Sequence, residues 1–175
     1  MSGSASKNKG KIGERELSKI FQKTFGGSWI RTFTSGAYTG GVNKFRSQIL
    51  SESQLLNQSN DIVAPDEFPN VAIECKFYKD FDFHHLFRVE GNAILNDWIN
   101  QVENSGIDMK KAFPMICFKI NRKGWFCCLW ENKLQKYNFK NIQHFYYCKD
   151  NKNFVICELE TLLKDFKEEL IESFQ

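Results

Sequence analysis

Apolar and polar residues recur along the chain with two different periods, which predict two kinds of structural element. Apolar residues return every three or four positions in three segments, which predicts helices at residues 10–25, 92–103 and 159–174. Alternating residues or short apolar runs predict strands at residues 28–34, 62–64, 71–78, 113–120, 125–130 and 154–157. This mixture predicts an α/β fold with a central mixed β-sheet flanked by helices.

The segment of residues 60–78 predicts a β-hairpin that carries polar side chains. Its two strands flank the sequence PDEFPN, which has the composition of a turn. Successive strand residues point to opposite faces, so Glu74 and Lys76 share one face of the second strand. Asp61, at the mouth of the first strand, can bring its carboxylate to the same place. The hairpin therefore predicts two carboxylates beside a lysine.

These three side chains favour a magnesium site that hydrolyses phosphodiesters. Mg²⁺ binds one or two carboxylates together with waters and substrate phosphate, and a neighbouring lysine can orient a water or offset charge on a phosphorane. A Glu-x-Lys pair is also common on the solvated face of a strand. The upstream carboxylate of Asp61 and the apolar residues around Glu74 favour the functional interpretation.

Glu14 is a candidate third carboxylate. In the predicted helix of residues 10–25 it falls on the apolar stripe, whereas Glu16 points to water and basic residues occupy the opposite side. A buried acid needs a partner or a metal. The alternative is a glutamate in the first turn that complements the helix dipole.

Composition and charge narrow the class of protein. The chain has 175 residues, 42% of them hydrophobic, which suits one domain at residues 10–175 preceded by a disordered basic tail at residues 1–9. Its sequence shows no membrane-length apolar stretch and no signal peptide, so we expect a cytoplasmic protein without a membrane partner. Residues 1–60 hold nine Lys or Arg against three Glu, which marks the phosphate-facing end; a solubilising basic tail is the alternative.

The six cysteines show no Cys-x-x-Cys motif, and we expect reduced core residues. A zinc site from Cys128, His144 and Cys148 is conceivable but lacks a fourth ligand at a recognisable spacing.

Residues 36–59 predict an inserted loop that is glycine-rich at first and basic afterwards. Its Arg, Lys and Tyr content suits contact with a nucleic-acid backbone.

The order of these features resembles the PD-(D/E)xK nuclease superfamily, whose core is restriction-endonuclease-like. A helix with Glu14 is followed by a strand, Asp61, Glu74-Cys75-Lys76 and a helix with Gln101. Within the superfamily, the segments KGKIGERELSKIF, WIRTFTSG, NDIVA and VAIECK resemble the archaeal-type Holliday junction resolvases, including versions carried by phages. This likeness covers residues 9–36 and 60–130, and the insertion at 36–59 departs from it.

The resemblance implies roles for particular residues. The implied catalytic residues are Glu14, Ser35, Asp61, Glu74 and Lys76. The implied metal ligands are Glu14, Asp61, Glu74 and the backbone carbonyl of Cys75. The DNA contacts implied by the resemblance are Arg15 and Arg31. We expect further DNA contacts from Lys11, Lys44, Arg46 and Gln101.

The resemblance also implies an activity. We expect a Mg²⁺-dependent endonuclease, with Mn²⁺ as a substitute, that cuts branched DNA such as four-way junctions. We expect it to act as a homodimer, because nicking two opposed strands needs two sites in matched orientation. The alternatives are a restriction or repair nuclease on duplex or single-stranded DNA, a non-catalytic DNA-binding subunit on a nuclease scaffold, and a plain interaction domain.

Overall fold

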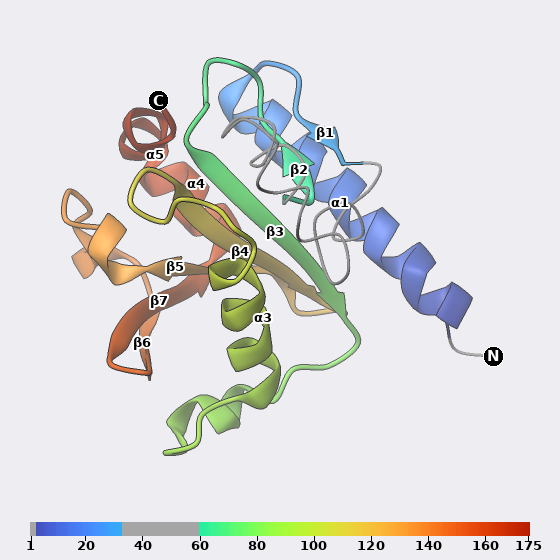
Figure 1. Cartoon of the computed structure of the whole chain (residues 1–175), viewed down its shortest axis with the longest axis vertical. Helices are drawn as coiled ribbons and strands as arrows, with labels where there is room; N and C mark the ends of the chain where they lie inside the picture. The colour runs from blue at the N-terminus through green and yellow to red at the C-terminus, as the bar shows by residue number, and fades with distance from the viewer. Residues whose placement is uncertain (1–2, 33–59) are drawn as a thin grey trace.

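A seven-stranded mixed β-sheet forms the centre of the computed structural model, which describes residues 3–32 and 60–175 (Figure 1). The strands are β1 (Ile30–Arg31), β2 (Ile62–Val63), β3 (Val71–Tyr78), β4 (Phe113–Ile120), β5 (Gly124–Trp130), β6 (His144–Lys149) and β7 (Lys152–Glu158). Their order across the sheet is β1-β2-β3-β4-β5-β7-β6. Strands β3 and β4 are parallel and the other described neighbours antiparallel, which confirms the predicted α/β class with a mixed sheet.

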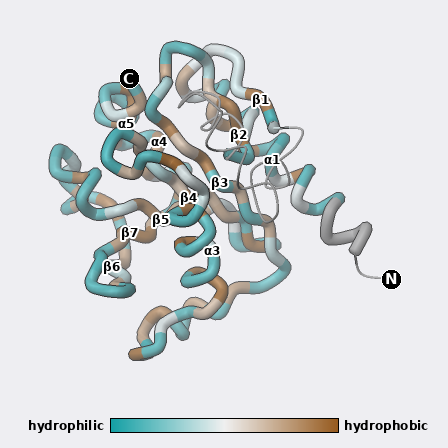
Figure 2. The backbone as a smooth tube through the Cα atoms, viewed as in Figure 1, coloured by the Kyte–Doolittle hydropathy of each residue, from teal (hydrophilic) through white to brown (hydrophobic). Residues whose placement is uncertain are grey.

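Helices cover both faces of this sheet. The α-helices are α1 (Gly3–Phe25), α3 (Ala93–Glu103), α4 (Leu159–Asp165) and α5 (Lys167–Phe174). Side chains of α1, α4 and α5 pack against one face of the sheet and form one hydrophobic cluster with it. Side chains of α3 pack against the other face and form a second cluster. None of the described helices is long and apolar enough to cross a membrane. Figure 2 shows many of the hydrophobic residues on the central strands.

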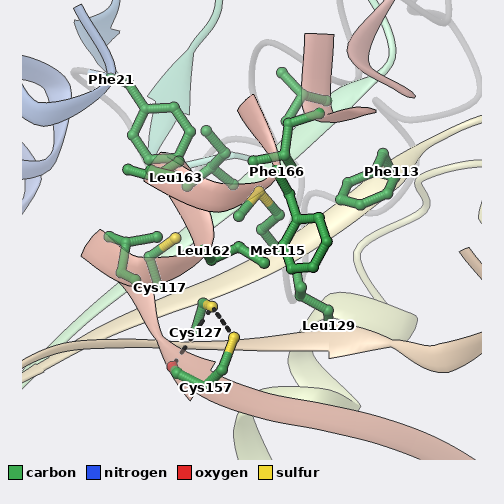
Figure 3. Close-up of a cluster of buried hydrophobic side chains, with 14 of the residues drawn as sticks. Phe21, Phe113, Met115, Cys117, Cys127, Leu129, Cys157, Leu162, Leu163 and Phe166 are labelled. Carbon is green, nitrogen blue, oxygen red and sulfur yellow. Dashed lines mark hydrogen bonds between the residues drawn. The ribbon is translucent and has the colours of Figure 1, made fainter. Parts of the chain in front are cut away.

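The larger cluster is built from side chains of distant segments (Figure 3). Phe21 of α1, Met115 of β4 and Leu162 of α4 are all fully buried there. The Sγ atoms of Cys127 and Cys157 lie 3.4 Å apart within it, and all six cysteines are free. Burying one large apolar side chain stabilises a fold by about 1.5–3 kcal/mol, so this cluster fixes α1 and α4 against the sheet.

Local sequence signals explain where the elements begin and turn. The predicted hairpin is confirmed, because β2 and β3 pair antiparallel with Ile62 opposite Ile73. Helix α3 begins after Asn92, whose Oδ1 accepts a hydrogen bond from the backbone N–H of Leu95 at 3.1 Å. Strands β4 and β5 meet at a turn in which Gly124 has a φ of 96°, the left-handed value that the sequence predicts there.

Three elements differ from the sequence prediction. Helix α1 begins at Gly3, so residues 3–9 are helical and not a disordered tail; no proline interrupts the helix in that segment. The single closing helix is two helices, because Phe166 leaves the helical region with φ −126° and ψ 30° and its ring packs on Tyr137 and Phe139. The described part of the predicted strand 28–34 forms only a two-residue strand, β1.

A close approach of α1 to β3 sets the position of Glu14. A Cβ atom at Gly13 would lie 3.1 Å from the Cβ of Phe77, so a glycine lets the helix pack directly on the strand. Glu16 does not simply point to water, because its Oε2 accepts a hydrogen bond from Lys119 Nζ of β4 at 2.5 Å. Because Gly13 and Glu16 hold α1 against β3 and β4, Glu14, which lies between them in the chain, is held at the edge of the sheet.

Candidate active site

The site lies along the outer edge of β3, beyond the end of the much shorter β2. Asp61 immediately precedes β2, and its backbone N–H donates to the carbonyl of Ile73 at 3.0 Å. Its Oδ2 accepts a hydrogen bond from the backbone N–H of Cys75 at 2.8 Å. The Asp61 side chain thus takes the place of a partner strand at Cys75. Because both backbone polar groups of a strand residue point to the same side, the Cys75 carbonyl also faces this edge.

Glu74 and Lys76 lie on the α3 face of β3, where Gln101 of α3 meets them. The Oε1 atom of Glu74 accepts hydrogen bonds from Lys76 Nζ at 2.6 Å and from Gln101 Nε2 at 2.5 Å. Lys76 Nζ also donates to Gln101 Oε1 at 2.7 Å. Glu74, Lys76 and Gln101 therefore form a closed triangle of polar contacts.

Two buried acids make the site electrostatically unusual. The exposed fraction is 8% for Asp61 and 6% for Glu74. Burial, and then the nearby Asp61, raise the pKa of Glu74 from its ordinary value of 4.5 to about 7, although Lys76 acts in the opposite direction. Two negative charges held this close out of water favour binding of a cation.

Glu14 joins the same electrostatic group from α1. Burial and Asp61 raise its pKa, and a hydrogen bond from Arg31 lowers it. Its Oε2 accepts that bond from Arg31 Nε at 2.5 Å, and both side chains are largely shielded from water. Arg31, which the resemblance implies as a DNA contact, therefore also forms an ion pair with Glu14.

The donor atoms suit a hard divalent cation. Within residues 3–32 and 60–175, no three His, Cys, Asp or Glu side chains are gathered as a metal cluster. Glu14 pairs with Arg31, and Glu74 pairs with Lys76. The carboxylates of Asp61 and Glu74 with the Cys75 carbonyl nevertheless fit Mg²⁺, which takes one or two carboxylates and completes its shell with water.

The conceivable zinc site is not formed by these residues. Cys128 is fully buried in the α3-side cluster, whereas Cys148 is exposed on β6. His144 Nδ1 lies 3.0 Å from the carbonyl of Ile142, where it is in hydrogen-bond contact. The three side chains therefore face different surroundings and do not converge on one point.

The remaining predicted residues fall into three groups. Lys11 and Arg15 are exposed on α1, and Lys11 lies near enough to Glu14 to lower the pKa of that acid. Gln101, which we expect as a DNA contact, bonds to Glu74 and Lys76 in the free protein. Its position three residues after Trp98, which packs on Tyr78 of β3, is a signal that could have placed it there. The residues that lie outside the described part of the chain are Ser35, Lys44, Arg46 and the rest of the insertion at 36–59.

Comparison with known proteins agrees with this geometry. The family model described as "Phage putative PDDEXK endonuclease" matches residues 5–173. Protein D14 of Escherichia phage T5 is 29% identical over 128 residues, which cover 71% of this chain and 70% of that protein. No solved structure matches the chain. The protein therefore belongs to the phage PDDEXK endonuclease family, which indicates a nuclease on a mixed α/β sheet.

Proposed function

We propose that the protein is a divalent-metal-dependent DNA endonuclease that hydrolyses phosphodiesters in branched DNA, as a Holliday junction resolvase does. One observation carries the catalytic part of this proposal. Asp61 and Glu74 are held together out of water, with Lys76 Nζ 2.6 Å from Glu74. A plain interaction surface gains nothing from such a pair, because two buried like charges oppose folding until a cation offsets them.

The residues of β3 and the preceding loop have distinct roles in this proposal. Asp61, Glu74 and the Cys75 carbonyl would hold Mg²⁺, or Mn²⁺ in its place, and the bound metal would supply an activated water and stabilise charge on the phosphoryl oxygens. Lys76 orients the attacking water and offsets charge as the phosphorane forms. Gln101 keeps Lys76 and Glu74 in register, since it bonds to both.

Glu14 and Arg31 extend the site towards the substrate. Glu14 is the third carboxylate of the proposed set, and its electrostatic coupling to Asp61 supports that assignment. Arg31 lies beside it on β1, so its guanidinium can contact a phosphate next to the scissile one. Of the other proposed DNA contacts, Lys11 and Arg15 are exposed on the same helix as Glu14.

The preference for branched DNA and the homodimer rest on the four segments that resemble the junction resolvases. A resolvase must nick two opposed strands, and a two-fold dimer supplies two active sites in matched orientation. The segments with the resemblance include the ones that form this site, namely α1, β1, Asp61 and β3. We therefore extend the substrate class of the junction resolvases to this chain.

The test is cleavage of matched DNA substrates by purified protein. A four-way junction, a flap, a linear duplex and a single strand are incubated with Mg²⁺, with Mn²⁺ or with EDTA. We expect symmetric nicks in the junction that need the metal, and a dimer in sedimentation velocity. Equal cutting of linear duplex would replace the junction preference with a restriction or repair activity. Cleavage that persists in excess EDTA, or none of any substrate, would contradict the metal-dependent nuclease.

A further inference from the structure

One face of α1 carries a row of basic residues that form no ion pair within the active site described above. Lys11, Arg15, Lys19 and Lys23 follow one another at intervals of four residues, and all four are exposed. We call these four residues the basic stripe. Figure 1 shows α1 on the outside of the sheet at the β1 to β3 side, with its N-terminal half projecting past the strands.

The geometry of a helix turns this spacing into a continuous track. Each step of four residues advances about 6 Å and rotates about 40° around the axis, so Lys11 and Lys23 are about 18 Å apart along α1. The track begins at the active site, because Lys11 is close enough to Glu14 to act on its charge. From there it winds across the outer face of the helix and away from the site.

The basic stripe lacks acidic partners within the described residues. No ion pair joins any of its four members to a described carboxylate, whereas other basic residues do form such pairs. Glu16 lies three residues before Lys19, a spacing at which helical ion pairs form, yet its carboxylate pairs with Lys119.

Keeping such a row costs stability. Like charges four residues apart destabilise a helix by about 0.2–0.5 kcal/mol per pair, and the stripe has three such pairs in sequence. A polyanion that lies along the helix removes this repulsion and gains the entropy of its released counterions. The spacing and the absence of described partners favour an extended, regularly charged ligand over a single anion.

We propose that the basic stripe binds the phosphate backbone of a duplex DNA arm that leads away from the scissile phosphate. This inference rests on the proposed function, because the active site fixes where the arm begins. Lys11 and Arg15 lie at the start of the arm, and Lys19 and Lys23 hold its continuation. The stripe contributes affinity without base preference, since it meets only phosphates.

The test compares the double variant Lys19→Ala/Lys23→Ala with Lys164→Ala/Lys167→Ala. The control removes two exposed lysines from α4 and α5, so both variants lower the net charge equally. Alanine and lysine are both good helix formers, so α1 should stay folded, as circular dichroism would verify. Affinity for a four-way junction and for a linear duplex is measured in EDTA over a series of KCl concentrations.

We expect the stripe variant to reduce the slope of log K against log salt by about 1.8, which is 0.9 for each lost phosphate contact. The control should match the wild type. A stripe variant with the slope of the control would overturn the stripe, even if the wild type cuts junctions. A reduced slope in a protein that cuts no DNA would support the stripe and contradict the proposed function, so the two failures are distinguishable.

Discussion

The substitution Glu74→Gln separates the charge of the buried acid from its shape. Glu74 Oε1 accepts hydrogen bonds from Lys76 at 2.6 Å and from Gln101 at 2.5 Å, and a glutamine carbonyl oxygen can accept both. The variant therefore keeps the packing of β3 against α3 and removes one of the two buried negative charges. A change of stability with pH then reports the cost of holding that charge beside Asp61.

The magnitude follows from the raised pKa of Glu74. Burial, and then Asp61, move this pKa from 4.5 to about 7. Below pH 4.5 the acid is neutral in both folded and unfolded protein, so the stability is fully present, and it is lost as the pH rises through about 7. At 1.36 kcal/mol per pKa unit the loss is roughly 3 kcal/mol. The free energy of unfolding of Glu74→Gln should gain this amount relative to the wild type between pH 4 and pH 8.

Urea unfolding in EDTA at the two pH values measures this difference, with Glu168→Gln as a control at an exposed glutamate of α5. For Glu168→Gln, the difference in free energy of unfolding from the wild type should be the same at pH 4 and pH 8. If the difference between Glu74→Gln and the wild type is the same at both pH values, holding the charge of Glu74 beside Asp61 costs no stability, which would contradict this prediction.

Mg²⁺ at 100 times its Kd should stabilise the wild type at pH 8 by about 2.7 kcal/mol. It should stabilise Glu74→Gln much less.

Two further predictions concern the surroundings of the site. Gln101→Ala should weaken Mg²⁺ binding or cleavage by about 10-fold to 100-fold, measured by Mg²⁺ titration of the cleavage rate, while Asn100→Ala on the exposed face of α3 should change neither. Gly13→Ala should destabilise the fold by about 1–3 kcal/mol, because its Cβ meets Phe77 at 3.1 Å. Gly10→Ala, with 3.9 Å of space, should stabilise it by about 0.5–1 kcal/mol in the same urea assay. Equal effects at the two glycines would contradict the close packing of α1.

The hairpin could be predicted because its signals are local. Turn residues separate two strands of period two, and that period alone puts Glu74 and Lys76 on one face. The partner strand of β3 also follows from sequence order, since Asp61 precedes it by a short turn. The same holds for α3, whose apolar spacing and Asn92 cap are visible in the sequence.

The partners of these side chains depend on packing between distant elements. Gln101 reaches Glu74 because α3 crosses the sheet between the parallel strands β3 and β4. Arg31 meets Glu14 because Gly13 brings α1 against β3. The break at Phe166 is equally non-local, since the apolar spacing runs through it and its ring is held by residues about thirty positions earlier. Periodicity along the chain cannot supply such contacts.

The central claim is that Asp61 and Lys76 act in the chemical step and not in binding. Single-turnover cleavage of a four-way junction in Mg²⁺ tests it most directly, with Asp61→Asn and Lys76→Ala compared with Asp66→Asn and Lys164→Ala, which change exposed residues. We expect the first two variants to lose on the order of 10³ in rate or more while they bind the junction within about threefold of the wild type. We expect the two controls to keep the rate and the affinity of the wild type. A folded Asp61→Asn or Lys76→Ala protein that cuts at the rate of the wild type would contradict the account.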